Sequence, residues 1–104
     1  MATQNQFKAM SLFNNVVAYL EECANELEIE DTDDINAAID AAQKVNFDLD
    51  RAVGFLFTYR RLVTDLAFTA WMKGSRDLGK QGCALLWKIN GLFVWKKYAS
   101  IARC

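Results

Sequence analysis

The chain has 104 residues, of which 53% are apolar and 24% are charged, so it can bury a core and is not expected to be disordered. It contains no histidine, which excludes Ser-His-Asp and Cys-His nucleophile systems and every metal site with a histidine ligand. We therefore expect one domain over residues 1–104, with no cofactor and no catalytic or metal-binding residues.

Charge is divided unequally between the two halves of the chain. Residues 1–50 carry 11 acidic and 2 basic side chains, a net charge of −9. Residues 51–104 carry 10 basic and 2 acidic side chains, a net charge of +8. Either the halves neutralise one another across the fold, or they form a charge polarity that orients a partner. The acidic side is concentrated in a ridge of eight residues: Glu21, Glu22, Glu26, Glu28, Glu30, Asp31, Asp33 and Asp34.

Apolar spacing predicts a first helix from about residue 4 to about residue 29. Its stripe steps by three and four residues through Phe7, Met10, Phe13, Val17, Leu20, Ala24 and Leu27. The acidic run at 30–34 ends this helix, and Asp33 or Asp34 is expected to cap a second one. The buried face of that second helix is predicted to be Ile35, Ala38, Ile39 and Ala42.

A third helix is predicted from Asp48, as its N-cap, to Gly74, after a turn at Asn46 and Phe47. One apolar stripe contains Leu49, Val53, Leu56, Val63, Ala67 and Ala70, and a second contains Phe55, Tyr59, Leu62 and Leu66. Two stripes about 80–100° apart indicate burial from two directions, which makes this helix the expected centre of the fold.

The glycine-rich segment 73–82 is expected to be a loop, and residues 83–98 admit two interpretations. Asn90-Gly91 favours a β-hairpin, whereas the poor separation of polar and apolar faces favours a helix over about 82–102. A single hairpin would also have no other strand to pair with. We favour the helix and predict an all-α fold, a compact four-helix up-and-down bundle with the third helix central.

Three short patterns fail as functional motifs. Gly74 to Gln81 nearly matches a phosphate-binding loop, but Gln81 replaces the hydroxyl that would hold magnesium. The segment from Asp31 lacks the glycine and the final carboxylate of a calcium loop. The spacing at 42–52 is that of a helix-turn-helix, but acids at the start of both helices would repel phosphate. No enzymatic activity is predicted.

The cysteines predict a reducing compartment. Cys23, Cys83 and Cys104 are odd in number, far apart and without a C-x-x-C pair, so three free thiols are expected. The N-terminal residues lack the basic-then-apolar order of a signal peptide. The longest apolar stretch, 83–95, is too short to span a bilayer. These observations predict a soluble, cytoplasmic protein.

The C-terminal segment mixes aromatic and basic residues and is the predicted partner-binding surface. Its candidate residues are Trp87, Phe93, Trp95, Lys96, Lys97, Tyr98 and Arg103. Tryptophan, tyrosine and arginine are typical of protein interfaces. The same mixture also occurs in cores with solvent-reaching lysines, on anionic membranes and at nucleic acids.

The function expected from these features is a small non-enzymatic module that binds another protein or its own copies. By analogy of size and charge, it would suit a viral or mobile-element accessory protein, either a virion subunit or an inhibitor of a host complex. The alternative is a nucleic-acid-binding protein that uses the C-terminal bases and aromatic residues.

Overall fold

The computed structural model describes the backbone of residues 4–30 and 32–102 and the side chains of residues 8–30 and 32–92. Within that part of the chain it contains five α-helices: α1 (Gln4–Glu26), α2 (Asp33–Gln43), α3 (Leu49–Thr58), α4 (Arg60–Met72) and α5 (Arg76–Ala102). The all-α class is thus confirmed, with one more helix than the four predicted.

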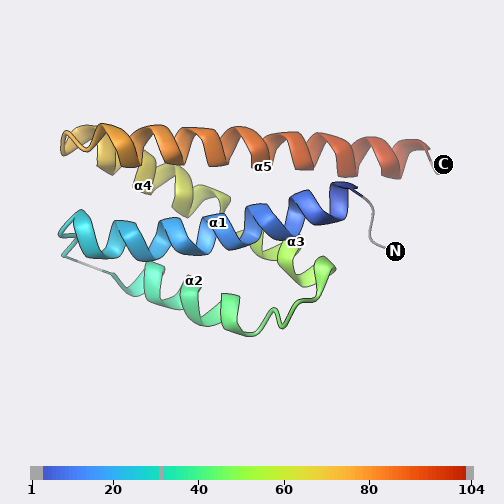
Figure 1. Cartoon of the computed structure of the whole chain (residues 1–104), viewed down its shortest axis with the longest axis horizontal. Coiled ribbons are helices and arrows are strands. Elements are labelled where there is room, and N and C mark those ends of the chain that lie inside the picture. The colour runs from blue at the N-terminus through green and yellow to red at the C-terminus, as the bar shows by residue number, and fades with distance from the viewer. Residues whose placement is uncertain (1–3, 31, 103–104) are drawn as a thin grey trace.

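The two longest helices, α1 and α5, run antiparallel along the long axis of the molecule (Figure 1). The molecule measures 45 × 25 × 21 Å. Both α1 and α3 contact all four of the other helices, so the central place predicted for the third helix is shared with α1. One apolar cluster joins residues from all five helices, and no polar or charged residue is buried among the described side chains.

The predicted third helix is instead two helices that meet at Tyr59, where φ is −102° and ψ is 11°. Both predicted stripes are nevertheless buried or half-buried. The break lets α3 turn its stripe toward α1 while α4 packs chiefly against α5. A straight helix would have to bury two stripes about 90° apart against partners on different sides. Phe55 marks the α3–α1 contact, with its ring edge-on to Phe13 at 5.1 Å between centroids.

The start of α5 corrects the loop predicted at 73–82. The connection is short, with Gly74 at φ 82°, and α5 already begins at Arg76. Gly79 and Gly82 therefore lie inside a helix, where they allow close packing instead of a turn. The same helix continues through Asn90-Gly91, so the helical interpretation of 83–98 is confirmed over the hairpin.

Helix ends agree with the sequence in part. Asp48 caps α3 as predicted, because its Oδ1 accepts a hydrogen bond of 3.2 Å from the Arg51 N–H. The N-cap of α2 is Thr32, not Asp33 or Asp34. These two acids lie in the first turn, where their negative charge interacts favourably with the positive end of the helix dipole. The first helix ends three residues early, at Glu26, because the backbone turns left-handed at Glu28 with φ 49°.

Candidate interaction surface

Glycines set the register of the antiparallel α4–α5 pair. A Cβ on Gly79 would lie 2.6 Å from the indole of Trp71, and one on Gly82 would lie 2.6 Å from the Cβ of Ala67. Residue 71 is thus opposite 79, and residue 67 is opposite 82. The same Cβ on Gly82 would also lie 2.5 Å from the hydroxyl oxygen of Tyr19 on α1, and this hydroxyl donates a 2.8 Å hydrogen bond to the Leu78 carbonyl.

This register leaves one side of the α4–α5 pair uncovered. Each of α4 and α5 has three faces, met in the same order when one turns about the helix axis in the same sense. The first faces α1, the second faces the other helix of the pair, and the third is an exposed stripe. In an antiparallel pair this order places both exposed stripes on the side away from α1. The stripe on α4 is Arg61, Thr64, Phe68 and Met72, and the stripe on α5 is Arg76, Lys80, Cys83, Trp87 and Asn90. We call these nine residues, with Trp71 between them, the outer face.

Large apolar side chains on the outer face are open to solvent. The exposed fraction is 66% for Phe68, 73% for Met72 and 80% for Trp87, and Trp71 is 44% exposed beside Gly79. Isolated exposed apolar residues are ordinary on protein surfaces, but four on one side of one helix pair are a feature of binding surfaces. The core is already closed beneath them by Val63, Ala67 and Leu78, all buried.

The outer face is also basic. Arg61, Arg76 and Lys80 are exposed within the two stripes, and neither stripe contains an acid. The acids of these helices are not among the stripe residues. Asp65 borders the α4 stripe, and Asp77 directly follows Arg76 and therefore points about 100° away from it around the axis of α5. Apolar groups flanked by cations suit a surface that recognises an anionic partner.

One of the seven predicted partner-binding residues, Trp87, lies on this face with its side chain described. Phe93, Trp95, Lys96, Lys97 and Tyr98 lie on the continuing α5 backbone, but their side chains are outside the described residues, as is all of Arg103. Sequence reasoning missed Phe68, Trp71 and Met72. The signal was present for Phe68 and Met72, which are large apolar residues outside both buried stripes of the predicted third helix. Trp71 lies four residues after Ala67 and so continues the first stripe.

The acidic ridge lies at the end of the molecule where α1 passes to α2, beside the α4–α5 turn (Figure 1). Its described members are all exposed except Glu22, which is half-buried, and Asp31 is outside the described residues. Among described side chains, no ion pair joins the glutamates of α1 to a base of α4 or α5. The ammonium of Lys73 instead donates to backbone carbonyls, 2.6 Å to Leu27 and 3.4 Å to Glu28. These hydrogen bonds join the carboxyl end of α1 to the α4–α5 turn.

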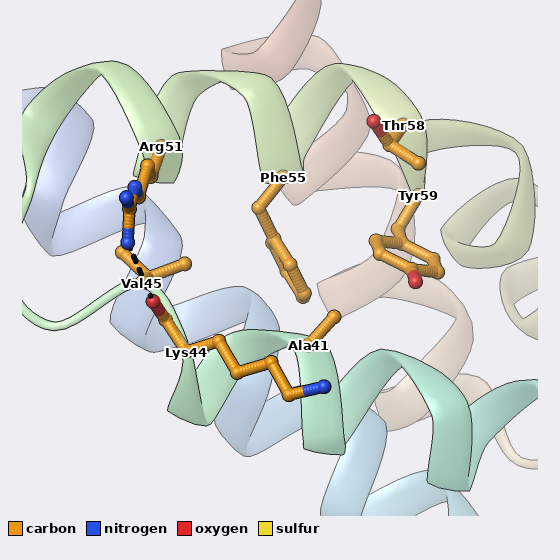
Figure 2. Close-up of a pocket in the computed structure, with 7 residues that line it drawn as sticks. All are labelled: Ala41, Lys44, Val45, Arg51, Phe55, Thr58 and Tyr59. Atoms are coloured by element: carbon orange, nitrogen blue, oxygen red, sulfur yellow. Dashed lines mark hydrogen bonds between the residues drawn. The ribbon is translucent and has the colours of Figure 1, made fainter.

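A groove of about 410 Å³ separates α2 from α3 (Figure 2). Phe55 and Tyr59 stand over Ala41, Arg51 lies beside Val45 at the other end, and the Lys44 side chain crosses the mouth. Arg51 donates a 3.4 Å hydrogen bond to the Lys44 carbonyl, and the Lys44 ammonium lies 3.6 Å from Asp40. Arg51 and Lys44, the two cations at this groove, thus already interact with groups of the same chain.

The neighbouring turn holds two consecutive left-handed residues. Asn46 has φ 51° and Phe47 has φ 60°, and Phe47 is 90% exposed. An aromatic residue in this conformation is strained, because its Cβ approaches the backbone carbonyl. The turn at Asn46 and Phe47 is where the sequence predicted it.

Buried titratable groups sit at the contact of α1 and α5. Burial raises the pKa of the Tyr19 hydroxyl well above its usual range and raises the pKa of the Cys23 thiol to about 11. Both groups are therefore neutral near pH 7, with Tyr19 hydrogen-bonded to Leu78. Cys23 is buried, Cys83 is exposed, and neither forms a disulfide; Cys104 is outside the described residues.

Over the described residues, no cluster of three or more histidine, cysteine or carboxylate side chains is placed to hold a metal ion. In the same part of the chain, no helix combines the length and hydropathy needed to cross a bilayer.

Comparison with known proteins adds no relative: no family model, no curated protein and no solved structure matches the chain.

Proposed function

We propose that this protein is a non-enzymatic module that binds another protein through the outer face of α4 and α5. The observation that carries the proposal is the exposure of Phe68, Met72 and Trp87 on one side of a helix pair whose α1-facing side is packed in the core. Removing such side chains from water on binding is favourable by roughly 25 cal/mol per Å² of apolar surface. These exposed side chains do not contribute to the buried core, so contact with a partner is the simplest role for them.

The proposal keeps the partner-binding role expected for Trp87 and extends the surface from α5 to α4. It also leaves room for the more specific role of a viral or mobile-element accessory protein, as a virion subunit or an inhibitor of a host complex. Those roles require a protein interface of this kind but are not distinguished by it.

Site-specific photo-crosslinking tests the proposal. A benzophenone amino acid at position 87 is expected to capture a protein in the native host, and the same group at the exposed position 36 on α2 is not. Capture is expected to be lost when Phe68→Ser and Met72→Ser are introduced together, since both side chains are exposed and removable without opening the core. Equal capture from positions 87 and 36, or capture that survives the double substitution, would exclude the outer face as the interface.

The alternative function, nucleic-acid binding, predicts a different outcome of the same experiment. A complex held by phosphate contacts weakens steeply as salt rises, and nuclease treatment removes it. Three bases of the outer face are exposed near Phe68 and Trp87, which is the observation in its favour. Against it, the acidic ridge lies beside the α4–α5 turn, where it would repel a polyanion that extended past that end of the molecule.

A further inference from the structure

We infer that the outer face takes an acidic amphipathic α-helix of another protein, an inference that rests on the proposed function and specifies its partner. Three features of the molecule support it: the shape left by α4 and α5, the charge around it, and the mismatch with a second copy of this chain.

The shape is that of two packed helices whose exposed side has room for a third helix. The side of α4 and α5 that faces α1 is buried by that helix, and the opposite side carries Phe68, Trp71, Met72 and Trp87 without cover. The α4 stripe spans 61–72 and the α5 stripe spans 76–90. At 1.5 Å per residue these stripes are about 16–21 Å long, which matches three to four turns of a helix. Apolar residues spaced three and four apart on such a helix would lie between the two stripes.

The charge selects an acidic helix. Arg61 lies near one end of the α4 stripe, and Arg76 and Lys80 lie at the start of the α5 stripe. In the antiparallel pair these bases therefore stand on opposite edges and toward opposite ends of the apolar strip. Carboxylates flanking the apolar face of a partner helix would meet them on both edges, whereas lysines would be repelled.

A second copy of the chain fits this face poorly. A symmetric dimer through the outer face would bring together two copies of the same acid-free stripes and would offer no carboxylate to Arg61, Arg76 or Lys80. The acidic segment of the chain offers carboxylates, but the apolar residues beside them, Leu27, Ile35 and Ala38, are buried in its own core. That segment can therefore supply charge but not the apolar surface needed to cover Trp87.

The experiment uses two probe peptides and the isotopically labelled full chain. Each peptide is an acetylated, amidated helix of about four turns with leucines spaced three and four residues apart. One carries glutamate at its polar positions, and the other carries lysine at the same positions. Amide shifts in the nuclear magnetic resonance spectrum report both the site and the affinity.

The glutamate peptide is expected to shift the amides of Phe68, Met72, Cys83 and Trp87, and to bind at least about tenfold more tightly than the lysine peptide. Equal affinity for both peptides, or shifts confined to other helices, would overturn the inference. Trp87→Ser and Phe68→Ser are each expected to weaken binding about tenfold or more without lowering the thermal midpoint, since both side chains are largely exposed.

Charge reversal on the outer face is the most discriminating test of the preference for the glutamate peptide. Arg76→Glu with Lys80→Glu is expected to reverse the preference, so that the lysine peptide binds more tightly. The matched control is Lys8→Glu with Lys44→Glu, which changes the net charge by the same amount at exposed positions on α1 and at the C-cap of α2. If the control reverses the preference as well, net charge and not the outer face selects the peptide, and the inference fails.

Three further outcomes separate the partners. Anionic vesicles of phosphatidylglycerol, or single-stranded oligothymidine, that shift the outer face more strongly than the glutamate peptide would replace the helical partner with a membrane or a nucleic acid. Concentration-dependent shifts of the same amides in the free chain would indicate a second copy. If neither peptide binds while crosslinking at position 87 still captures a protein, the acidic-helix inference fails and the proposed function stands; if both experiments fail, both are wrong.

Discussion

At the scale of single residues, the contact of α1 with α5 depends on a glycine. Gly82 is buried, and a Cβ at this position would lie 2.5 Å from the Tyr19 hydroxyl oxygen. That hydroxyl also donates to the Leu78 carbonyl, so the ring cannot withdraw without breaking a buried hydrogen bond. The absence of a side chain is therefore what lets α1 and α5 approach here.

Gly82→Ala is accordingly expected to destabilise the protein by about 1–2 kcal/mol, because overpacking outweighs the gain of about 1 kcal/mol in helix propensity. Urea denaturation followed by circular dichroism measures the change. Gly91→Ala is the matched control: it lies in the same helix with nothing within 4 Å of the new Cβ, so it is expected to stabilise by about 0.5–1 kcal/mol. Equal stabilisation by both substitutions would contradict the close contact with Tyr19.

The buried thiol of Cys23 predicts a loss of stability at alkaline pH. Burial raises its pKa from 9.0 to about 11. In the unfolded chain the thiol ionises first, so the stabilisation is complete below pH 9 and is lost as pH rises toward 11. The full loss is about 2–3 kcal/mol for a shift of this size.

Urea midpoints measured in reductant between pH 9 and pH 10 test this, because Tyr19 adds its own dependence above that window. The wild-type midpoint is expected to fall across the window, and the midpoint of Cys23→Ala is expected to fall less steeply from its own lower starting value. Parallel slopes for the two proteins would mean that the thiol ionises as readily in the folded state as in the unfolded state.

At the scale of secondary-structure elements, the C-terminal end of α1 is held by a side chain from far along the sequence. The Lys73 ammonium donates to the carbonyls of Leu27 and Glu28, just beyond the last turn of α1. A cation at this position both satisfies carbonyls that lack a partner within the helix and complements the negative end of the helix dipole. It also ties the middle of the acidic ridge to the α4–α5 turn.

Lys73→Met keeps most of the apolar stem and removes the charge, so it is expected to cost about 1 kcal/mol in the free energy of unfolding. Lys73→Arg is expected to retain part of the stabilisation. Lys88→Met, at an exposed lysine of α5, serves as the control and is expected to change stability by less than about 0.5 kcal/mol. A loss at Lys88 as large as that at Lys73 would indicate a general charge effect and not capping.

The helices themselves were predictable where spacing and caps agree. The span of α1, the cap at Asp48 and the turn at Asn46 and Phe47 each correspond to a local rule, and each is found close to its predicted place. The buried face of α1 is instead rotated from the predicted stripe, toward Val16 and Tyr19. The break at Tyr59 was not predictable, because no glycine or proline stands there and the cause is tertiary: two stripes must face different helices. Gly79 and Gly82 misled the prediction because the sequence does not distinguish a glycine that allows close helix packing from a glycine that forms a loop.

At the scale of the whole molecule, the candidate surface was predictable only in part. Trp87 stood out because bases and aromatic residues surround it in sequence, whereas Phe68 and Met72 join it only through the register of α4 against α5. The charge polarity was visible in the sequence, but its geometry was not. The fold places the acidic ridge at one end of a 45 Å molecule, next to the turn that leads into the basic start of α5.

This arrangement predicts a salt-dependent influence of the ridge on binding at the outer face. The Debye length is about 30 Å at 0.01 M ionic strength and about 8 Å at 0.15 M. At low salt an approaching acidic helix therefore senses the glutamates of the ridge as well as Arg76 and Lys80, and the two fields largely cancel. At physiological salt the bases nearest the docking site dominate.

Replacing Glu26, Glu28 and Glu30 together with glutamine is therefore expected to speed association of the glutamate probe peptide several-fold at about 0.01 M salt, and to have a much smaller effect at about 0.15 M. Trp87→Ser is expected to act differently, raising the dissociation rate at both salt concentrations, because apolar contact is lost only from the formed complex. Stopped-flow fluorescence measures both rate constants. An equal acceleration at the two salt concentrations would mean that these glutamates touch the peptide directly, and no acceleration at either would mean that the ridge is too far from the outer face to influence it. In the expected case, the acidic half of the chain opposes docking of an acidic partner outside the outer face, and the polarity of the molecule contributes to selectivity as well as to attraction.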